Sequence, residues 1–351
     1  MPENIAFDAH QSLSLLRRFV EHVARGETEP RPPTWVLDVQ GCPGALAAEL
    51  PDGPRVLTVN REPRGVADYV RATGVALPLG PETMSAVVVS DALEHVPPAR
   101  RADLFSEICR VSRGWVLING PFRAPEVEQA EASVNDLYRA ACGKPNPSLA
   151  DHGQHDLPVL AETRAALEER GFTTTVVPNG SLFSWFLLKS LEVIFQVLPD
   201  ATTQFEQIND LYVRLWSASD HRRPTYRHLV LAHRDSDRVL ELLQDPPPHT
   251  GLEFFGPRTE VPQANPDEAQ RIRAVATLFE RLAVFLREQT AGGTATVEWA
   301  YVRRLERIVE EHEEQRRRLE KEVVELRAAL AAYESSRLVR LWQRLRGKRG
   351  D

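Results

Sequence analysis

The fold is constrained most by an alternation of short β-rich runs with helical segments, which begins at residue 34. The runs WVLDV, RVLTV, SAVVVS and WVLING occupy residues 35–39, 55–59, 85–90 and 115–120. Runs of Val, Ile and Leu bounded by turns are typical of strands buried on both faces, and their alternation with helices predicts a parallel sheet. Right-handed crossovers between such strands lead to a doubly wound α/β fold.

Helical and extended patterns flank this alternation. Residues 8–25 carry apolar positions at helical spacing and predict a leading helix, and residues 61–73 are also interpreted as helical. Residues 173–180 and 226–234 are interpreted as two strands that close the sheet as an antiparallel hairpin. An apolar insertion at about residues 181–222 separates these two strands.

The most apolar stretch of the chain is SLFSWFLLKSLEVIFQVL, residues 181–198. It is short for a membrane span, and Lys189 and Glu192 interrupt it. Two interpretations stay open. The stretch is either a helix of the core or of a lid, or a surface that meets lipid or a lipid-linked substrate.

The C-terminal part of the chain predicts a coiled coil. Leu319, Val323, Leu326, Leu330 and Tyr333 follow one another at steps of four and three, as the seam of a coiled coil does. We expect self-association through this seam, with packing against the rest of the chain as the alternative. The basic amphipathic end has the composition of a helix on an anionic membrane surface, or of a solvated coiled-coil end. The expected organisation is a leading helix (1–29), an α/β domain (30–235), a proline-rich linker (236–266), a helix (267–290) and the coiled coil with its basic end (295–346).

Composition excludes several classes of protein. A formal net charge of −7 argues against a nucleic-acid-binding protein, whose surface would be basic. The three cysteines form no CxxC, so neither a disulfide framework nor a zinc site is indicated, and no other metal-ligand set stands out. The N-terminus lacks the pattern of a signal peptide. We therefore expect a cytoplasmic protein, with peripheral contact at the inner face of the membrane as a further expectation from the basic end.

The segment TWVLDVQGCPGALAAEL, residues 34–50, has the pattern of a buried strand that runs through a tight turn into a helix. Glycines in such a turn allow the backbone to approach a ligand, and the amides at the helix N-terminus point toward it. Asp38 ends the strand and can accept hydrogen bonds. Asn60 ends the next strand, roughly 20 residues further on, where dinucleotide-binding folds place a ribose-binding acid.

A second motif gives this segment its context. Residues 90–97 read SDALEHVP, preceded by LPL at 77–79 and followed by RVSRG at 110–114. With these motifs, residues 30–235 resemble the class I S-adenosylmethionine-dependent methyltransferases, in particular the S-D-x-L-E-H-V-P branch found with glycan biosynthesis. The resemblance implies a Rossmann-like, mostly parallel seven-stranded sheet with an antiparallel closing hairpin. It also implies that S-adenosylmethionine binds across the carboxyl ends of the first strands, in agreement with the general rule for open α/β sheets.

The resemblance assigns a donor site, and this chain departs from the family pattern there. The loop reads DVQGCPG instead of D-x-G-x-G-x-G, Asn60 replaces the usual ribose-binding acid, and Thr73 stands where an Asp often contacts the adenine amine. An amide in place of a carboxylate weakens a hydrogen bond by about 1–2 kcal/mol. The implied cofactor-binding residues are Asp38, Gln40, Gly41, Cys42, Gly44, Asn60, Thr73, Asp91, Leu93 and His95.

The resemblance also suggests residues on the acceptor side. The segment DHGQHDLP, residues 151–158, is similar to an E-H-x-x-x-L-P element of related methyltransferases from glycan gene clusters. Asp151, His152 and His155 offer a carboxylate and two imidazoles that suit general-base catalysis on a sugar hydroxyl. For any one of these histidines the alternative is a loop or capping role. Asn179, Tyr226 and Arg227 are the implied substrate-binding residues.

Two functions follow as expectations. The first is methyl transfer from S-adenosylmethionine to an oxygen of a small molecule or of a glycan or lipid-linked saccharide. The second is a catalytically silent relative that serves as a scaffold in a glycan-assembly complex and meets its partners through the coiled coil. A nicotinamide-binding Rossmann protein is a remoter alternative, against which the SDALEHVP motif argues.

Overall fold

The computed structural model describes most of the α/β part of the chain. The described residues are 7–25, 35–40, 45–50, 54–60, 68–198, 202–215, 217, 220–221 and 223–244. The chain divides into two compact units, Met1–Ala291 and Gly292–Asp351, and every described residue belongs to the first. The helix predicted at 267–290 and the coiled coil predicted at 295–346 therefore lie outside the described residues.

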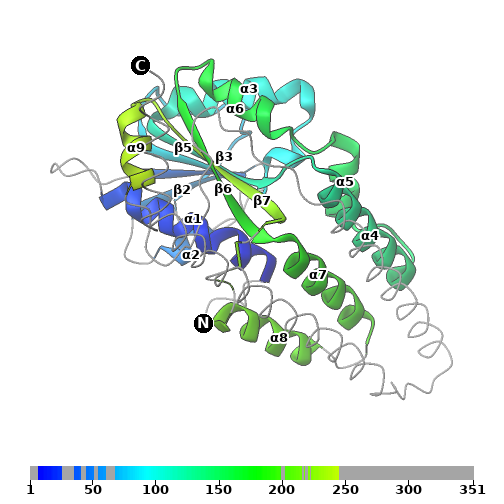
Figure 1. Cartoon of the computed structure of the whole chain (residues 1–351). Helices are drawn as coiled ribbons and strands as arrows, with labels where there is room; N and C mark the ends of the chain where they lie inside the picture. Colours follow the sequence, from blue (N-terminus) through cyan, green and yellow to red (C-terminus); the bar gives the residue numbers. More distant parts are fainter. Residues whose placement is uncertain are drawn as a thin grey trace, which may run out of the picture. The chain divides into compact units, whose positions relative to one another are not determined.

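Seven strands and a set of helices make up the described part (Figure 1). The strands are β1 (Trp35–Val39), β2 (Arg55–Asn60), β3 (Tyr69–Arg71), β4 (Met84–Ser90), β5 (Ser112–Pro121), β6 (Thr173–Ser181) and β7 (Thr225–His233). The helices are α1 (Phe7–Arg25), α2 (Ala45–Glu49), the 3₁₀ turn η1 (Leu93–His95), α3 (Pro98–Val111), α4 (Pro125–Cys142), α5 (Pro147–His155), α6 (Leu160–Glu168), α7 (Leu182–Val197), α8 (Thr202–Leu215) and α9 (Ser236–Gln244).

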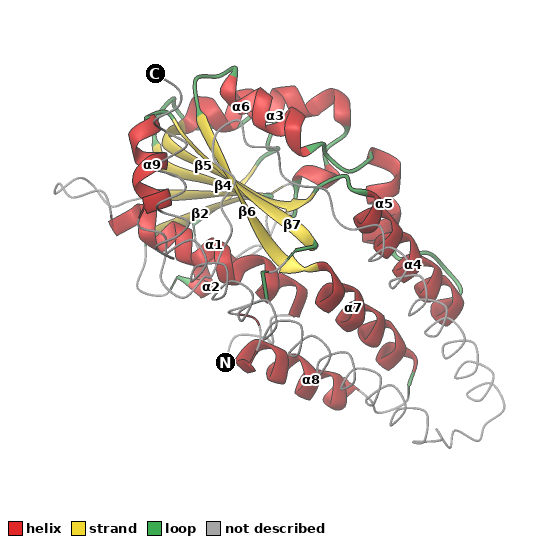
Figure 2. Ribbon diagram, viewed as in Figure 1, coloured by secondary structure: helices red, strands yellow, loops and turns green. Residues whose placement is uncertain are grey.

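The strands form one sheet in the order β3-β2-β1-β4-β5-β7-β6 (Figure 2). The first five strands in this order pair in parallel, whereas β7 runs antiparallel to both β5 and β6. The predicted Rossmann-like methyltransferase fold, with its mostly parallel seven-stranded sheet and antiparallel closing hairpin, is confirmed.

Helices cover both faces of the sheet (Figure 1). On one face, α1, α2 and α9 pack against the strands, and Leu15, Leu16 and Phe19 of α1 are fully buried. On the other face α3 and α6 supply the core, with Ile108 and Leu167 fully buried. The predicted leading helix is thus part of the core of the sheet domain, because its apolar face covers β4 and β5.

Two predicted elements are wrong in part. Residues 61–73 were expected to be helical, but Tyr69–Arg71 form the edge strand β3, and residues 61–67 lie outside the described residues. A three-residue strand is too short to show an alternating pattern. The linker was expected to begin at residue 236, but Ser236–Gln244 form α9 and Val239 is fully buried. The prolines that follow dominated the composition and obscured this helix.

The apolar insertion forms α7 and α8. One face of α7 is buried within the protein, including Trp185, Phe186 and Ile194, and α7 lies beside α4 (Figure 1). Lys189, which interrupts the apolar run, forms ion pairs with Asp8 and Glu192. These contacts favour a core helix over a lipid-facing one. Among the described residues, no helix has the length and apolar character needed to cross a membrane.

Candidate functional site

A cavity of about 320 Å³ lies at the carboxyl ends of β1 and β4. Its volume is at the lower end of the range for small-molecule sites. Asp38 and Ser90 line it from the two strand ends, and α1, α2, Asp91, η1, α5, α7 and β7 supply the remaining described walls. This is the edge at which open α/β sheets bind their ligands.

The two sequence motifs meet at this cavity because β1 and β4 are neighbours in the sheet. Asp38 pairs with Val88 in the parallel register, which brings the end of WVLDV beside the start of SDALEHVP. Asp91 then turns the chain away from the sheet with a left-handed φ of 46°, and its amide donates to the Asn119 carbonyl at 2.8 Å. Both motifs therefore present polar groups to one space.

Asp38 is a buried acid with a raised pKa. Its side chain is buried at the wall of the cavity, and burial raises its pKa to about 7. Asp38 forms no ion pair with any residue that the structure describes. A cationic group placed in the cavity would stabilise the charged carboxylate, because an opposite charge at short range favours ionisation. Asp38 is therefore suited to receive a positively charged part of a ligand.

A buried arginine organises one side of the cavity. Nε of Arg227 donates to Oδ1 of Asp91 at 2.6 Å, and its Nη2 donates to Oδ1 of Asp8. Burial alone would lower the pKa of Arg227, but Asp91 and Asp8 raise it well above its ordinary value. Burial would raise the pKa of Asp8, yet Arg227 and Lys189 lower it to about 2. We call these four residues the ion-paired wall, and their charges are mutually compensated.

Two imidazoles form another side. Nδ1 of His95 lies 2.6 Å from Oδ2 of Asp151, and Nδ1 of His152 lies 3.0 Å from Oε1 of Glu131. Because a carboxylate only accepts hydrogen bonds, each Nδ1 carries the proton and each Nε2 is directed elsewhere. The two rings have centroids 4.8 Å apart.

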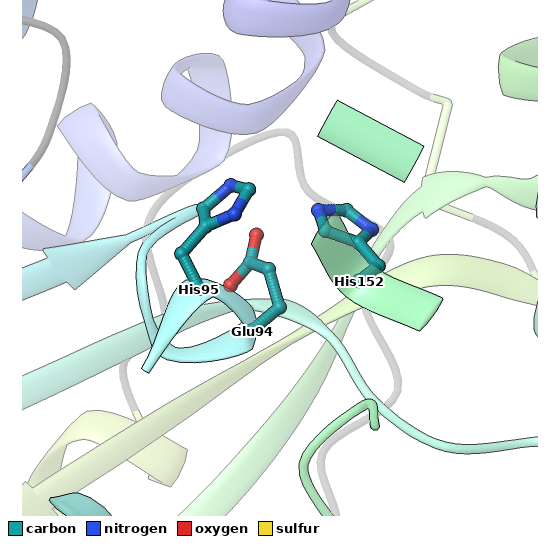
Figure 3. Close-up of side chains that lie close together, drawn as sticks. All are labelled: Glu94, His95 and His152. Atoms are coloured by element: carbon teal, nitrogen blue, oxygen red, sulfur yellow. The ribbon is translucent and has the colours of Figure 1, made fainter. Parts of the chain in front are cut away.

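Glu94 completes this group, and Figure 3 shows its carboxyl group between the two imidazole rings. Its side chain is only 2% exposed, and burial, together with the nearby charge of Asp91, raises its pKa to about 8. Among the described residues, Oε2 of Glu94 and Nε2 of His152 have no hydrogen-bond partner. We call Glu94, His95 and His152 the imidazole wall.

Tyr226 connects the two walls. Its ring stacks on Trp185 with centroids 3.8 Å apart, and its hydroxyl donates to Oε1 of Glu131 at 2.7 Å. Burial raises the pKa of Tyr226 well above its ordinary value, so the hydroxyl keeps its proton and remains a donor. Tyr226 and Arg227 both line the cavity, and their substrate-binding role stays a prediction.

Asn179 and His155 do not reach the cavity. Asn179 is fully buried, and its amide donates to the Ser12 carbonyl at 3.1 Å and to Oδ1 of Asn119 at 2.8 Å. These bonds join β6 to α1 and β5, so its described contacts are structural, and its substrate-binding role stays a prediction. Nε2 of His155 lies 3.5 Å from Oδ1 of Asp151. His155 is not among the described residues that line the cavity.

The structure places only some of the predicted donor-binding residues at the cavity. Asp38, Asp91 and His95 line the cavity, and Leu93 is buried in η1 beside them. Asn60 and Thr73 lie beyond this cavity, at the end of β2 and just after β3. Gln40, directly after β1, adopts a left-handed φ of 61°, which is uncommon for a residue other than glycine. Gly41, Cys42 and Gly44 lie outside the described residues.

Sequence reasoning missed several groups of the site. Glu94 stands inside the SDALEHVP motif, so its position there was a usable signal. Glu131 lies on α4, a helix that was not predicted, and no local pattern indicated its contact with His152. Asp8 and Lys189 come from distant helices, and only the tertiary fold brings them to Arg227.

Comparison with known proteins finds methyltransferases among the proteins that are similar to this chain. No family model matches it. An uncharacterized methyltransferase of Mycobacteroides abscessus is 35% identical over 114 residues, which cover 26% of this chain and 43% of that protein. The chain thus spans less than half the length of this relative.

Among solved structures, the YcgJ protein of Bacillus subtilis has a TM-score of 0.38 and 16% identity, over 64% of this chain and 98% of that one. A SAM-dependent methyltransferase from Archaeoglobus fulgidus has a TM-score of 0.36 and 15% identity, over 62% of this chain and 94% of that one. Magnesium protoporphyrin IX methyltransferase of Synechocystis, solved with bound SAM, has a TM-score of 0.37 and 13% identity, over 65% of this chain and 81% of that one. The sheet order described above, with β7 antiparallel between β5 and β6, gives this chain the class I methyltransferase fold.

Proposed function

We propose that this chain is an S-adenosylmethionine-dependent methyltransferase that methylates an oxygen of a small-molecule or glycan acceptor. One observation carries the proposal: the strand-end acid Asp38 and the SDALEHVP motif meet at a cavity on the carboxyl edge of a class I methyltransferase sheet. The methyltransferase relative is consistent with it.

The described residues fit the polar, cationic part of such a donor. Asp38 is a buried acid without a described cation partner, and a donor ammonium group beside it would lower its pKa from about 7. Ser90 at the end of β4 and Asp91 directly after it line the same cavity. When bound, S-adenosylmethionine supplies an electrophilic methyl group on a sulfonium sulfur. The role of Asp38 is to orient the donor and to balance its charge.

The imidazole wall supports an oxygen acceptor. Its two histidines are fixed in orientation by Asp151 and Glu131, and they border the same cavity as Asp38. Groups that can hold a hydroxyl and take part in its deprotonation are what O-methylation requires. The glycan class of the acceptor is supported by the motif resemblance alone.

Calorimetric titration of the full chain with S-adenosylmethionine tests the proposal. We expect saturable binding, and we expect Asp38→Ala to weaken it by about tenfold or more, as the loss of a charged hydrogen bond implies. Asp103→Ala on the exposed surface of α3 is the matched control and should bind like the unaltered chain. Absence of binding at millimolar donor would contradict the proposal and favour the alternative.

That alternative is a silent scaffold, and a specific observation favours it. Asn60 and Thr73, which replace the family acids, lie beyond the described cavity, so the described residues offer no carboxylate to the donor's ribose and adenine there. A scaffold would still associate with itself through the seam at 319–333. Light scattering on the full chain and on the Leu319→Lys, Leu326→Lys variant would then differ in mass, with or without donor.

A further inference from the structure

We propose that Glu94, His95 and His152 form a binding site for a divalent transition-metal ion. One oxygen of the carboxyl group and one nitrogen of each imidazole lie within 4.8 Å of one another. A metal ion binds such atoms at about 2.0–2.2 Å, so small side-chain movements would bring all three into coordination. No metal site was expected from the sequence, because His152 is distant from Glu94 and His95 along the chain.

The fold brings the three ligands together at the edge of the cavity. Glu94 and His95 are adjacent in η1, directly after the turn at Asp91 that ends β4. His152 lies on α5, which packs against η1. Figure 3 shows the carboxyl group of Glu94 between the rings contributed by these two elements.

Two buried atoms of this group lack partners, and this observation is independent of their clustering. Oε2 of Glu94 and Nε2 of His152 have no hydrogen-bond partner among the described residues, while their side chains are 2% and 6% exposed. A buried polar atom left without a partner costs about 1–3 kcal/mol. A cation bound between these atoms would satisfy both at once, because each presents a lone pair.

The surrounding hydrogen bonds resemble those that support metal-bound histidines. In protein metal sites a ligating imidazole almost always donates its other N–H to a carboxylate or carbonyl, which fixes the ring and raises its basicity. Here Asp151 holds Nδ1 of His95 and Glu131 holds Nδ1 of His152, so each Nε2 is available to the ion. The Tyr226 hydroxyl in turn donates to Glu131. Glu131 is thus itself held in place.

The ligand set selects the class of ion. Two imidazole nitrogens and one carboxylate oxygen suit Mn²⁺, Fe²⁺, Co²⁺ or Zn²⁺, whereas Mg²⁺ and Ca²⁺ prefer oxygen ligands. Three protein ligands leave coordination positions for another molecule. Because all three residues line the cavity, those positions are accessible from it. If the proposed function holds, an acceptor oxygen would take one of them and be held beside the methyl donor.

Metal titration of the full chain tests the site without any donor or acceptor. The chain is stripped with a chelator, the chelator is removed, and Co²⁺ is added while its visible absorption is followed; Zn²⁺ is then measured by calorimetry. We expect about one ion per chain at this site. Glu94→Gln and His152→Ala should each weaken binding by about 100-fold, and Glu131→Gln by about tenfold or more. A tenfold excess of Mg²⁺ should not displace Co²⁺.

The matched control is His155→Ala, which removes an imidazole from the same helix but outside the imidazole wall. Its affinity for Co²⁺ should stay within about threefold of the unaltered chain, and circular dichroism checks the folding of every variant. Equal binding by His155→Ala and Glu94→Gln, or no stoichiometric binding by the unaltered chain, would overturn the site. S-adenosylmethionine titration in the presence of chelator is a separate measurement. A chain that binds no metal can therefore still bind the methyl donor, and a chain that binds no donor can still bind the metal.

Discussion

The ion-paired wall and the imidazole wall border the same cavity, but their polar groups are satisfied to different extents. Arg227 donates hydrogen bonds to Asp91, Asp8 and Gln11, and Lys189 forms a second ion pair with Asp8. In the imidazole wall, two histidines anchored by carboxylates lie beside the buried carboxyl group of Glu94, and Oε2 of Glu94 and Nε2 of His152 have no hydrogen-bond partner among the described residues.

The comparison distinguishes charged groups that stabilise the fold from polar groups that are positioned to bind a ligand. Charges that compensate one another hold α1, β4 and β7 together at the cavity and need nothing from outside. Lone pairs that converge without a partner are stabilised only when something binds. The predictions below test the two walls, Asp38 and Asn60.

The largest effect is expected for Arg227→Met. It removes the charge that compensates Asp8 and Asp91 and leaves both half-buried carboxylates without it. Loss of one partner of a buried ion pair costs about 3–5 kcal/mol. Urea denaturation should show a decrease of this size in the free energy of unfolding. Arg238→Met, which breaks an exposed pair with Glu241, should change it by about 1 kcal/mol or less. A similar loss in both variants would remove the distinction between this wall and an ordinary surface pair.

Asp38 should give the protein a characteristic dependence on pH. The folded chain holds a proton on Asp38 up to about pH 7, whereas the unfolded chain releases it near the ordinary pKa of 3.8. Stability from this group is therefore fully present below about pH 4 and is lost as the pH rises toward about 7, by at most about 4 kcal/mol. Asp38→Asn should abolish this part of the slope in urea denaturation. Parallel pH profiles for the two proteins would show that Asp38 is not held protonated.

Metal binding should stabilise the chain through the imidazole wall. At Zn²⁺ equal to about 100 times its dissociation constant, the free energy of unfolding should rise by about 3 kcal/mol. Thermal denaturation with Zn²⁺ and with chelator measures the difference, and Glu94→Gln should show little of it. Stabilisation that persists in Glu94→Gln would place the ion elsewhere in the chain.

The smallest effect is expected at Asn60. If this residue faces the donor's ribose, Asn60→Asp restores a carboxylate acceptor and should tighten S-adenosylmethionine binding by about 1–2 kcal/mol, or roughly tenfold. Calorimetry measures the change, with Thr73→Asp as a second restored acid. Unchanged or weaker binding in Asn60→Asp would count against a ribose contact at the end of β2.

Patterns within short segments explain what was predictable. WVLDV and SAVVVS are continuous apolar runs, so β1 and β4 could be placed, and their parallel pairing puts Asp38 beside Val88, close to the end of β4. The edge strand β3 has three residues and shows no such pattern. The contacts of Arg227, and the approach of His152 to Glu94, join segments far apart in the chain, and no local pattern encodes them. Asn179 was assigned to substrate from its motif, and its full burial could not be foreseen from that segment alone.

The central claim is that the methyl donor binds at the joined ends of β1 and β4. A crystal structure of the full chain with S-adenosylhomocysteine tests it most directly. We expect the product's amino group next to the carboxylate of Asp38, in the cavity bordered by Ser90 and Asp91. Product bound at another place, or a cavity without product under saturating conditions, would contradict the account.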